Sequence, residues 1–320
     1  MPEEYVQVEH LVKRYGDVVA VDDLSFSVHP GEIFGFLGPN GAGKSTTINV
    51  LVGLTKWNSG QIRVAGHDLA HEAKAVKAQI GLVPQEIALY RNLPAKRNVE
   101  YFASLYGLHG KALKEAVAEA LAFVGLSEQA DRRVSKLSGG MQRRLNIACG
   151  IAHHPKLIVM DEPTVGVDPQ SREHILAGVK TLRERGATVI YTSHYMPEVQ
   201  EICDRIAIVD HGKLIGCGSE RELLALVTDQ KRIRVEFAPA GEEASAELVK
   251  RVQLLPDIRT AALDREQPSL LNIDAQVDLA DYSSILSVFI ELGLPIKQIT
   301  SEAPDLETTF LALTGRELRS

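Results

Sequence analysis

The sequence contains few residues of the kinds that cross-link secreted proteins or hold metal clusters. It has only three cysteines among 320 residues, Cys149, Cys203 and Cys217. Their number is odd, they are widely separated, and no CxxC pair is present, which predicts neither a disulfide framework nor a zinc site. This usage indicates a chain that works in a reducing compartment.

Long apolar runs and an excess of basic residues are also missing. No apolar stretch approaches the roughly 20 residues that a membrane-spanning helix needs, and the acidic residues 1–4 include no apolar signal-peptide region. The formal net charge is −7, which argues against nucleic acid as a partner. Hydrophobic residues make up 45% of the chain and charged residues 24%, so we expect a packed core rather than disorder.

The clearest motif is a glycine-rich loop between a predicted strand and a predicted helix. Residues 38–45 read GPNGAGKS, which has the form GxxxxGK[ST], between the strand-like residues 31–37 and the helix-like residues 44–51. In such loops the backbone N–H groups converge on phosphate oxygens, the lysine reaches the outer phosphates and the hydroxyl binds Mg²⁺. The predicted phosphate-binding residues are Gly38, Pro39, Asn40, Gly41, Ala42, Gly43, Lys44, Ser45 and Thr46.

Two further motifs extend this pattern. The apolar residues 157–160 run into Asp161 and Glu162, as expected of a buried strand that delivers carboxylates to its tip. Residues 137–142 read LSGGMQ and open a predicted helix with two glycines, which is itself a phosphate-binding pattern. One nucleotide does not need two phosphate loops from one subunit, whereas two subunits that face each other would need both.

In this order, the motifs resemble the ATP-binding subunit of ABC transporters over about residues 5–220. The resemblance identifies residues 38–45 as the Walker A motif, residues 137–142 as the signature motif and residues 157–161 as the Walker B strand. It also identifies a Q-loop glutamine, a D-loop aspartate, a switch histidine and an aromatic residue that stacks on adenine: Gln85, Asp168, His194 and Tyr15.

The resemblance implies that the chain binds ATP with Mg²⁺ and hydrolyses it. Glu162 would be the general base that polarises the attacking water, and the implied catalytic set is Glu162, His194, Lys44 and Gln85. The implied Mg²⁺ ligands are Ser45, Gln85 and Asp161. The nucleotide bound by a second subunit would be contacted by Ser138, Gly139, Gly140 and Asp168. ATP would then hold two subunits together.

Several of these residues also have a structural interpretation. Asp161 and Glu162 could be carboxylates that cap nearby amides, and Gln85 could be a surface loop residue. Tyr15 could be a core aromatic residue. Asp168 precedes a proline, and Asp-Pro is also an ordinary helix start. A lone histidine after a strand is more often structural, although the Thr-Ser-His context at the end of an apolar strand favours function.

The remaining pattern predicts an α/β fold in two domains. The resemblance implies that residues 1–220 form an ABC-type ATP-binding domain with a P-loop NTPase core. The βα alternation predicts a mostly parallel sheet there, with a helical lobe inserted at about residues 70–135. Residues 221–320 are expected to form a small α+β accessory domain, because the order of predicted elements is βαββαβ, as in ferredoxin-like folds.

The resemblance implies that the chain energises transport through separate multi-span membrane permease subunits, with a second ATP-binding subunit as its dimer partner. Residues 305–311 resemble the tails of exporter-type ATPases for drugs, lipids or polysaccharides, which indicates export. The expected location is cytoplasmic, peripheral on the inner face of the cell membrane. A cytosolic non-transport ABC ATPase is one alternative, but the long coiled coil or second ATPase copy that such relatives carry is missing. A nucleotide-binding regulatory subunit is the other, but the base and the signature glycines are intact.

Overall fold

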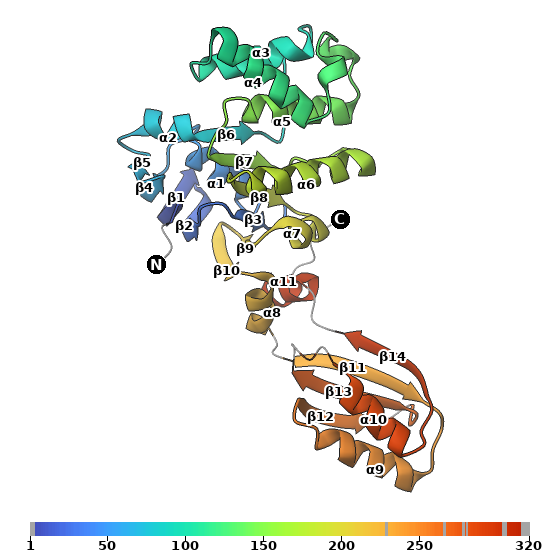
Figure 1. Cartoon of the computed structure of the whole chain (residues 1–320). Helices are drawn as coiled ribbons and strands as arrows, with labels where there is room; N and C mark the ends of the chain where they lie inside the picture. Colours follow the sequence, from blue (N-terminus) through green and yellow to red (C-terminus); the bar gives the residue numbers. More distant parts are fainter. Residues whose placement is uncertain are drawn as a thin grey trace. The chain divides into compact units, whose positions relative to one another are not determined.

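The computed structural model describes residues 4–227, 230–264, 267–276, 279, 281–302 and 306–314. These residues divide into two compact units, one within Met1–Glu220 and one within Arg221–Gly315 (Figure 1). Each unit has its own hydrophobic core. None of the helices in the described residues is long and apolar enough to cross a membrane.

A six-stranded sheet forms the centre of the first unit. It consists of β3 (Ile33–Leu37), β6 (Ile80–Val83), β7 (Leu157–Asp161), β8 (Thr188–Ser193), β9 (Arg205–Asp210) and β10 (Lys213–Gly218). The strand order is β10-β9-β3-β8-β7-β6, and every neighbouring pair is parallel except β10 with β9. The prediction of a mostly parallel sheet is confirmed.

The N-terminal strands form a separate antiparallel sheet. Its members are β1 (Val6–Tyr15), β2 (Val18–Val28), β4 (Ser59–Val64) and β5 (His67–Asp68), in the order β2-β1-β4-β5. The sequence pattern predicts strands in this region but not that they pair apart from the central sheet. Strand pairing depends on distant partners, which a local alternation of apolar and polar residues does not identify.

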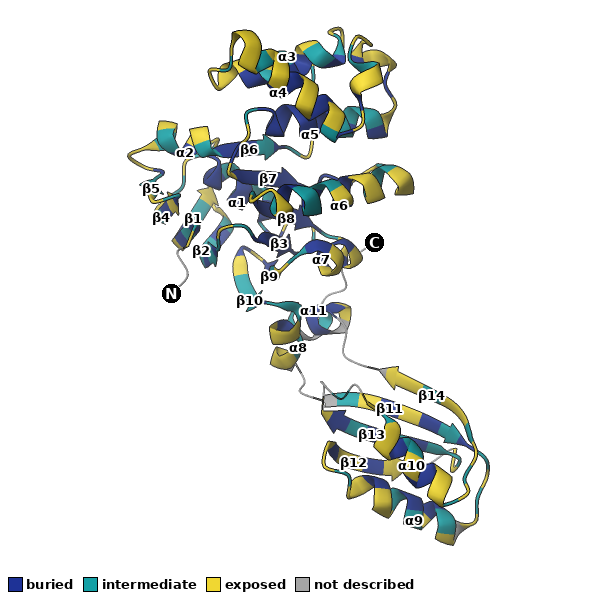
Figure 2. Ribbon diagram, in the orientation of Figure 1, coloured by how far each residue is buried: buried dark blue, intermediate teal, exposed yellow. Residues whose placement is uncertain are grey.

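The core of the first unit covers both faces of the central sheet, and β3, β7, β8 and β9 are almost entirely buried in Figure 2, whereas the edge strand β10 is not. Successive strand residues point to opposite faces, so Ile33 packs with α5 (Gly139–Ile151) and α6 (Pro169–Glu184). Phe34 packs on the other side with the antiparallel sheet and α1 (Lys44–Leu51). There the Phe26 and Phe34 rings stack with their centroids 5.6 Å apart.

The helical lobe is formed by α3 (Ala95–Leu105) and α4 (Gly110–Phe123), which pack on α5. The short helices η1 (Ser127–Gln129) and η2 (Val134–Lys136) follow α4 in the chain. Helix α2 (Ala73–Gln79) packs instead on β4 and β5, and α7 (Met196–Ile202) packs on β3 and β8. The helical lobe expected at about residues 70–135 is interrupted at Ile80–Val83, which forms the strand β6. A four-residue apolar run fits a buried strand as well as a helix, and only its pairing with β7 decides between them.

From β11 to β14 the second unit has the predicted βαββαβ order, and one helix flanks this run on each side. Its elements are α8 (Glu220–Val227), β11 (Gln230–Phe237), α9 (Glu242–Gln253), β12 (Ile258–Leu263), β13 (Leu270–Gln276), α10 (Ser283–Glu291), β14 (Ile296–Glu302) and α11 (Leu306–Thr314). The antiparallel sheet has the order β12-β13-β11-β14, and α9 and α10 share one core with it. This is a ferredoxin-like arrangement. Residue 305, the first of the exporter-like residues 305–311, lies outside the described residues.

Candidate functional site

The glycine-rich loop joins β3 to α1. Gly43 caps α1 with a φ of 99°, a left-handed value that favours glycine, and an added Cβ there would lie 2.5 Å from Ala20 O. Asn40 and Gly41 are exposed at the tip of the loop, whereas Ala42 is buried. The loop therefore presents exposed backbone at the start of a helix, where N–H groups attract anions.

Lys44 points from the start of α1 back into this loop. Its Nζ donates to Gly38 O at 2.7 Å and to Pro39 O at 3.2 Å, and it lies 3.4 Å from Glu162 Oε1. Burial lowers the pKa of Lys44, because desolvation disfavours the ammonium, while the neighbouring Glu162 and Asp161 carboxylates act in the opposite direction. A lysine that is only 5% exposed therefore directs its ammonium into the loop.

The two acids at the tip of β7 are held by the neighbouring strand β8. Thr192 Oγ1 donates to Asp161 Oδ1 at 2.6 Å and accepts from the Glu162 backbone N–H at 2.9 Å. Glu162 has a φ of 46°, which is strained for a residue with a Cβ and persists only where its surroundings determine it. Among the described residues no backbone amide donates to either carboxylate, so neither acid is a backbone cap: Asp161 accepts from Thr192, and Glu162 faces the loop lysine.

Two further predicted residues meet the Glu162 carboxylate. Gln85 Nε2 donates to Glu162 Oε2 at 3.0 Å, so Gln85 is not merely a surface loop residue. His194 Nδ1 lies 3.3 Å from Glu162 Oε1, without hydrogen-bond geometry. Lys44, Gln85 and His194, from three different segments, thus surround one carboxylate. Their catalytic roles stay predictions.

These side chains line a cavity of about 440 Å³. Tyr15 does not line it: this residue ends β1, is 50% exposed, and has Lys13 Nζ 4.4 Å from its ring centroid. Tyr15 is therefore not a core aromatic residue, and its role toward adenine stays a prediction. The cavity is lined by Ala20, Asn40, Gly41, Gly43, Lys44, Ser45, Thr46, Gln85, Glu162, Val165 and His194.

The signature motif and the D-loop aspartate lie beside each other and do not line this cavity. Ser138 caps α5 by accepting from the backbone N–H three residues ahead at 3.3 Å. Asp168 caps α6 by accepting from Ser171 N at 2.9 Å and from Ser171 Oγ at 2.7 Å, and these bonds lower the pKa of Asp168. Gly140 packs against that cap, whereas an added Cβ on Gly139 would meet no heavy atom within 4 Å. The helix-start interpretation of Asp168 is therefore correct, and it leaves an additional role at a subunit contact open.

Two buried polar residues of α5, which the sequence pattern did not predict as functional, hold the loop that carries Gln85. Arg143 Nη1 and Asn146 Nδ2 donate to Pro84 O at 3.0 and 3.3 Å, and Asn146 Oδ1 accepts from Ala88 N at 3.2 Å. Burial lowers the pKa of Arg143, and the Asp161 and Glu162 carboxylates oppose that change. The signal in the sequence was two polar residues, three positions apart, on a helix face that is otherwise formed by apolar residues and glycines.

The predicted Mg²⁺ ligands are compatible with that ion. The Ser45 hydroxyl, the Gln85 amide and the Asp161 carboxylate supply oxygen atoms, which Mg²⁺ prefers, and Thr192 uses only one Asp161 oxygen. Among the described residues no group of three or more His, Cys, Asp or Glu side chains could hold a metal ion by itself. This fits an ion that takes its other ligands from phosphate and water.

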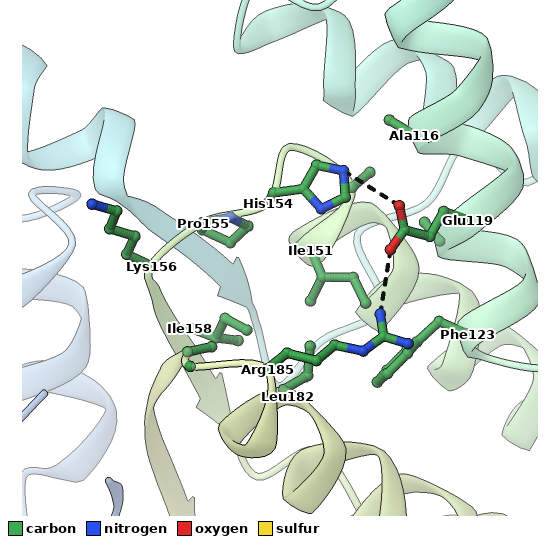
Figure 3. A pocket seen from close by; sticks show the side chains of 14 residues that line it. Ala116, Glu119, Phe123, Ile151, His154, Pro155, Lys156, Ile158, Leu182 and Arg185 are labelled. Atoms are coloured by element: carbon green, nitrogen blue, oxygen red, sulfur yellow. Dashed lines mark hydrogen bonds and ion pairs between the residues drawn. The ribbon is translucent and has the colours of Figure 1, made fainter. Parts of the chain in front are cut away.

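A second cavity, of about 210 Å³, lies where α4 meets the ends of α5 and α6 (Figure 3). At its rim Glu119 lies 3.3 Å from Arg185 Nη1 and 3.7 Å from His154 Nε2, as the dashed lines show. These exposed ion pairs contribute at most about 1 kcal/mol. The cavity shares no residue with the phosphate-loop cavity, and its walls are mainly apolar: Ala116, Ala120, Phe123, Ile151, Ile158 and Leu182.

Comparisons with known proteins agree with this geometry. Residues 21–165 match the ABC transporter family. The chain is 43% identical to the linearmycin resistance ATP-binding protein LnrL of Bacillus subtilis, over 98% of this chain and 99% of that protein. It is 34% identical to the Nod factor export ATP-binding protein I of Paraburkholderia xenovorans over the whole of both chains.

Solved structures show the same fold for the first unit. A dimeric ATP-binding cassette in a post-hydrolysis state, bound to ADP and Pi, superposes with a TM-score of 0.62 and 26% sequence identity. The match covers 67% of this chain and 98% of that chain. With this likeness in sequence over its whole length, the chain belongs to the ATP-binding proteins of the ABC transporter family.

Proposed function

We propose that this chain binds and hydrolyses ATP to power export through separate membrane subunits. The observation that carries the proposal is the convergence of Lys44, Gln85 and His194 on the Glu162 carboxylate, in a cavity built on a phosphate loop. As a member of its family, the chain is an ATP-binding protein and an ATPase.

In this proposal the triphosphate of ATP lies over residues 38–46, where the start of α1 and the Lys44 ammonium favour negative charge. Lys44 Nζ donates to two loop carbonyls and forms an ion pair with Glu162. A bound phosphate competes for the same ammonium and so weakens the ion pair. Glu162 then accepts a proton from the attacking water, and His194 donates an N–H to the γ-phosphate. Tyr15 stacks on the adenine ring.

Ser45, Gln85 and Asp161 would hold Mg²⁺. When bound, the ion neutralises charge on the outer phosphates. Thr192 fixes Asp161 for this purpose, because its hydroxyl occupies Oδ1 and thereby sets the orientation of the carboxylate.

We assign Ser138, Gly139, Gly140 and Asp168 to the nucleotide bound by a second copy of the chain. Two observations support this assignment. These residues do not line the cavity of their own chain. The start of α5 offers backbone N–H groups for an anion, and no heavy atom lies within 4 Å of the Cβ position of Gly139. ATP then makes contacts that exist only in the closed dimer. A ligand shifts an equilibrium by its differential affinity for the two states, so ATP closes the dimer and hydrolysis reopens it.

The membrane partner is a multi-span permease, and the chain lies at the cytoplasmic face of the membrane as a peripheral protein. Residues 1–220 are the ATP-binding domain, and residues 221–320 are an accessory domain. Relatives named for linearmycin resistance and for Nod factor export support export as the direction of transport. They also favour a transporter subunit over a non-transport ATPase.

The proposal is tested by phosphate release from Mg-ATP with the purified full chain at increasing protein concentration. Turnover per molecule is expected to rise with concentration, because each pocket is completed by a second copy. Glu162→Gln is expected to lower turnover by about 100-fold or more and to sediment as a dimer with ATP. A per-molecule rate that stays flat on dilution would contradict the shared pocket, and undiminished turnover by Glu162→Gln would contradict the base.

Purification from detergent-solubilised membranes tests the transport role. A multi-span membrane protein is expected to co-purify with the tagged chain. Recovery of the chain with no membrane protein, alongside intact ATP turnover, would favour the non-transport alternative.

A further inference from the structure

A buried acid that does not line the cavity bonds to residues directly preceding two that do. Glu198 belongs to the first turn of α7, four residues after His194, and is only 2% exposed. Its Oε2 accepts from Tyr191 OH at 2.8 Å, from Thr164 Oγ1 at 2.8 Å and from Ser193 Oγ at 3.4 Å. Three hydroxyl groups from two segments thus meet at one carboxylate oxygen.

The other carboxylate oxygen faces the start of α6. Glu198 Oε1 lies 3.2 Å from Arg172 Nε, without hydrogen-bond geometry. The Arg172 guanidinium also lies 4.9 Å from the centroid of the Tyr195 ring. One arginine on the first turns of α6 is therefore joined to Glu198 and to the residue that follows His194.

The partners of Glu198 lie within four residues of three proposed functional residues. Thr164 is two residues after Glu162, Ser193 directly precedes His194, and Arg172 is four residues after Asp168. Glu198 is therefore a common contact of the segments that carry the base, the switch histidine and the D-loop aspartate.

An ordinary structural role explains this arrangement poorly. An acid in the first turn of a helix usually accepts from the free backbone N–H groups there, but among the described residues no backbone N–H donates to this carboxylate. Burying an ionisable pair also costs desolvation, so an apolar residue would hold α7 in place at lower cost. Burial and the nearby Glu198 raise the pKa of Tyr191, which keeps its hydroxyl as a donor.

We infer that Glu198 is a positioning residue that fixes the Glu162, Asp168 and His194 segments in one arrangement. A displacement of the D-loop at the dimer contact then moves Arg172, and Glu198 transmits this movement to the turn that carries His194. The inference rests on the proposed function, because it assumes that these three residues act on ATP.

The test compares Glu198→Gln with a matched control, Glu32→Gln. Glu32 is also buried, at 9% exposure, and pairs with Arg205 at 3.1 Å. It lies just before β3, at the opposite end of that strand from the phosphate loop. Both variants remove a buried charge, so both are expected to lower Tm, but only Glu198→Gln should affect catalysis.

Turnover of Mg-ATP by the full chain is measured together with the binding of a fluorescent ATP analogue. We expect Glu198→Gln to lower kcat by about 10- to 100-fold, as for misplaced catalytic groups. KM for ATP and analogue affinity are expected to stay within about twofold of the wild-type values. Glu198→Asp, which keeps the carboxylate, is expected to recover part of kcat. Arg172→Met, which changes a partly exposed side chain, should lower kcat by a smaller factor. This variant keeps the test valid if Glu198→Gln does not fold.

A kcat for Glu198→Gln equal to that of Glu32→Gln would overturn the inference, and so would an equal loss of analogue affinity and kcat. If Glu198→Gln does not fold, wild-type kcat in Arg172→Met overturns it. Absence of turnover in the wild-type chain would instead refute the proposed function, and this inference with it.

Discussion

Lys44 Nζ lies 3.4 Å from Glu162 Oε1, so the phosphate-loop lysine and the candidate base form an ion pair inside the chain. Both side chains are almost fully buried. Removing one partner of a buried pair leaves the other charge uncompensated. The ion pair therefore links nucleotide binding at the loop to the environment of the Glu162 carboxylate. Substituting either residue breaks the pair.

Lys44→Met is expected to weaken Mg-ATP binding about 10- to 150-fold, since hydrogen bonds to charged groups contribute about 1.5–3 kcal/mol. It should also lower Tm, because Glu162 becomes an unpaired buried acid. Fluorescent-nucleotide titration and thermal unfolding measure the two effects. The exposed Lys56→Met is the control. The double variant Lys44→Met with Glu162→Gln should recover Tm but not affinity; recovery of both would contradict the role of Lys44 toward phosphate.

Ser138→Arg is expected to leave ATP binding near normal and to stop hydrolysis, because the long side chain obstructs the pocket of the partner copy. The substitution also removes the cap of α5, which costs about 1 kcal/mol. Ser138→Ala loses the same cap and any Ser138 contact to the partner's nucleotide but adds no bulk, so it should keep more turnover than Ser138→Arg. The measurements are analogue binding and phosphate release. Full turnover by Ser138→Arg would mean that each chain works alone.

The two signature glycines should respond differently to alanine. A Cβ on Gly140 would collide with Ser171 Oγ and lie 2.9 Å from Ser171 Cβ, whereas Gly139 has open space. Gly140→Ala is expected to lower Tm, and adding Ser171→Gly should restore part of it. Gly139→Ala should keep or slightly raise Tm, since alanine is favoured over glycine in helices by up to about 1 kcal/mol, yet lower turnover. Equal Tm values for Gly139→Ala and Gly140→Ala would contradict the close packing of Gly140 on Ser171.

His153 should make folding stability depend on pH. Its ring stacks on Tyr106 at 3.4 Å, and both residues bond to Ile80 O. Burial lowers the pKa of His153 to about 4, below the ordinary value of 6.5. Between these values the unfolded chain binds a proton that the folded chain does not. The contribution of His153 to the free energy of unfolding is therefore fully present above pH 6.5. It falls as the pH drops toward 4, by at most about 1.4 kcal/mol per pH unit.

His153→Phe keeps an aromatic ring beside Tyr106 but cannot bind that proton. Urea unfolding of both chains from pH 7.5 to 4.5 isolates the contribution of His153, because other groups titrate in both. The free-energy advantage of the wild-type chain is expected to shrink as pH falls. Parallel curves would show that His153 has an ordinary pKa in the folded chain.

The sequence by itself determined the features that adjacent residues encode. Glycines followed by a lysine and a helical pattern predict a phosphate loop, because backbone conformation and the start of a helix depend on neighbouring residues. The helix Lys44–Leu51 and the βαββαβ order of the second unit follow from local periodicity in the same way.

Only the tertiary structure decided which distant residues meet. Gln85 and His194 reach Glu162 because the parallel order β8-β7-β6 brings their segments to one end of the sheet, although 77 residues separate Gln85 from Glu162. Thr192 and Glu198 were not predicted, since each looks like an ordinary polar residue until its partners are known. A local pattern reports whether a side chain is apolar, but the cost of burying a polar group depends on the donors and acceptors that other strands place beside it.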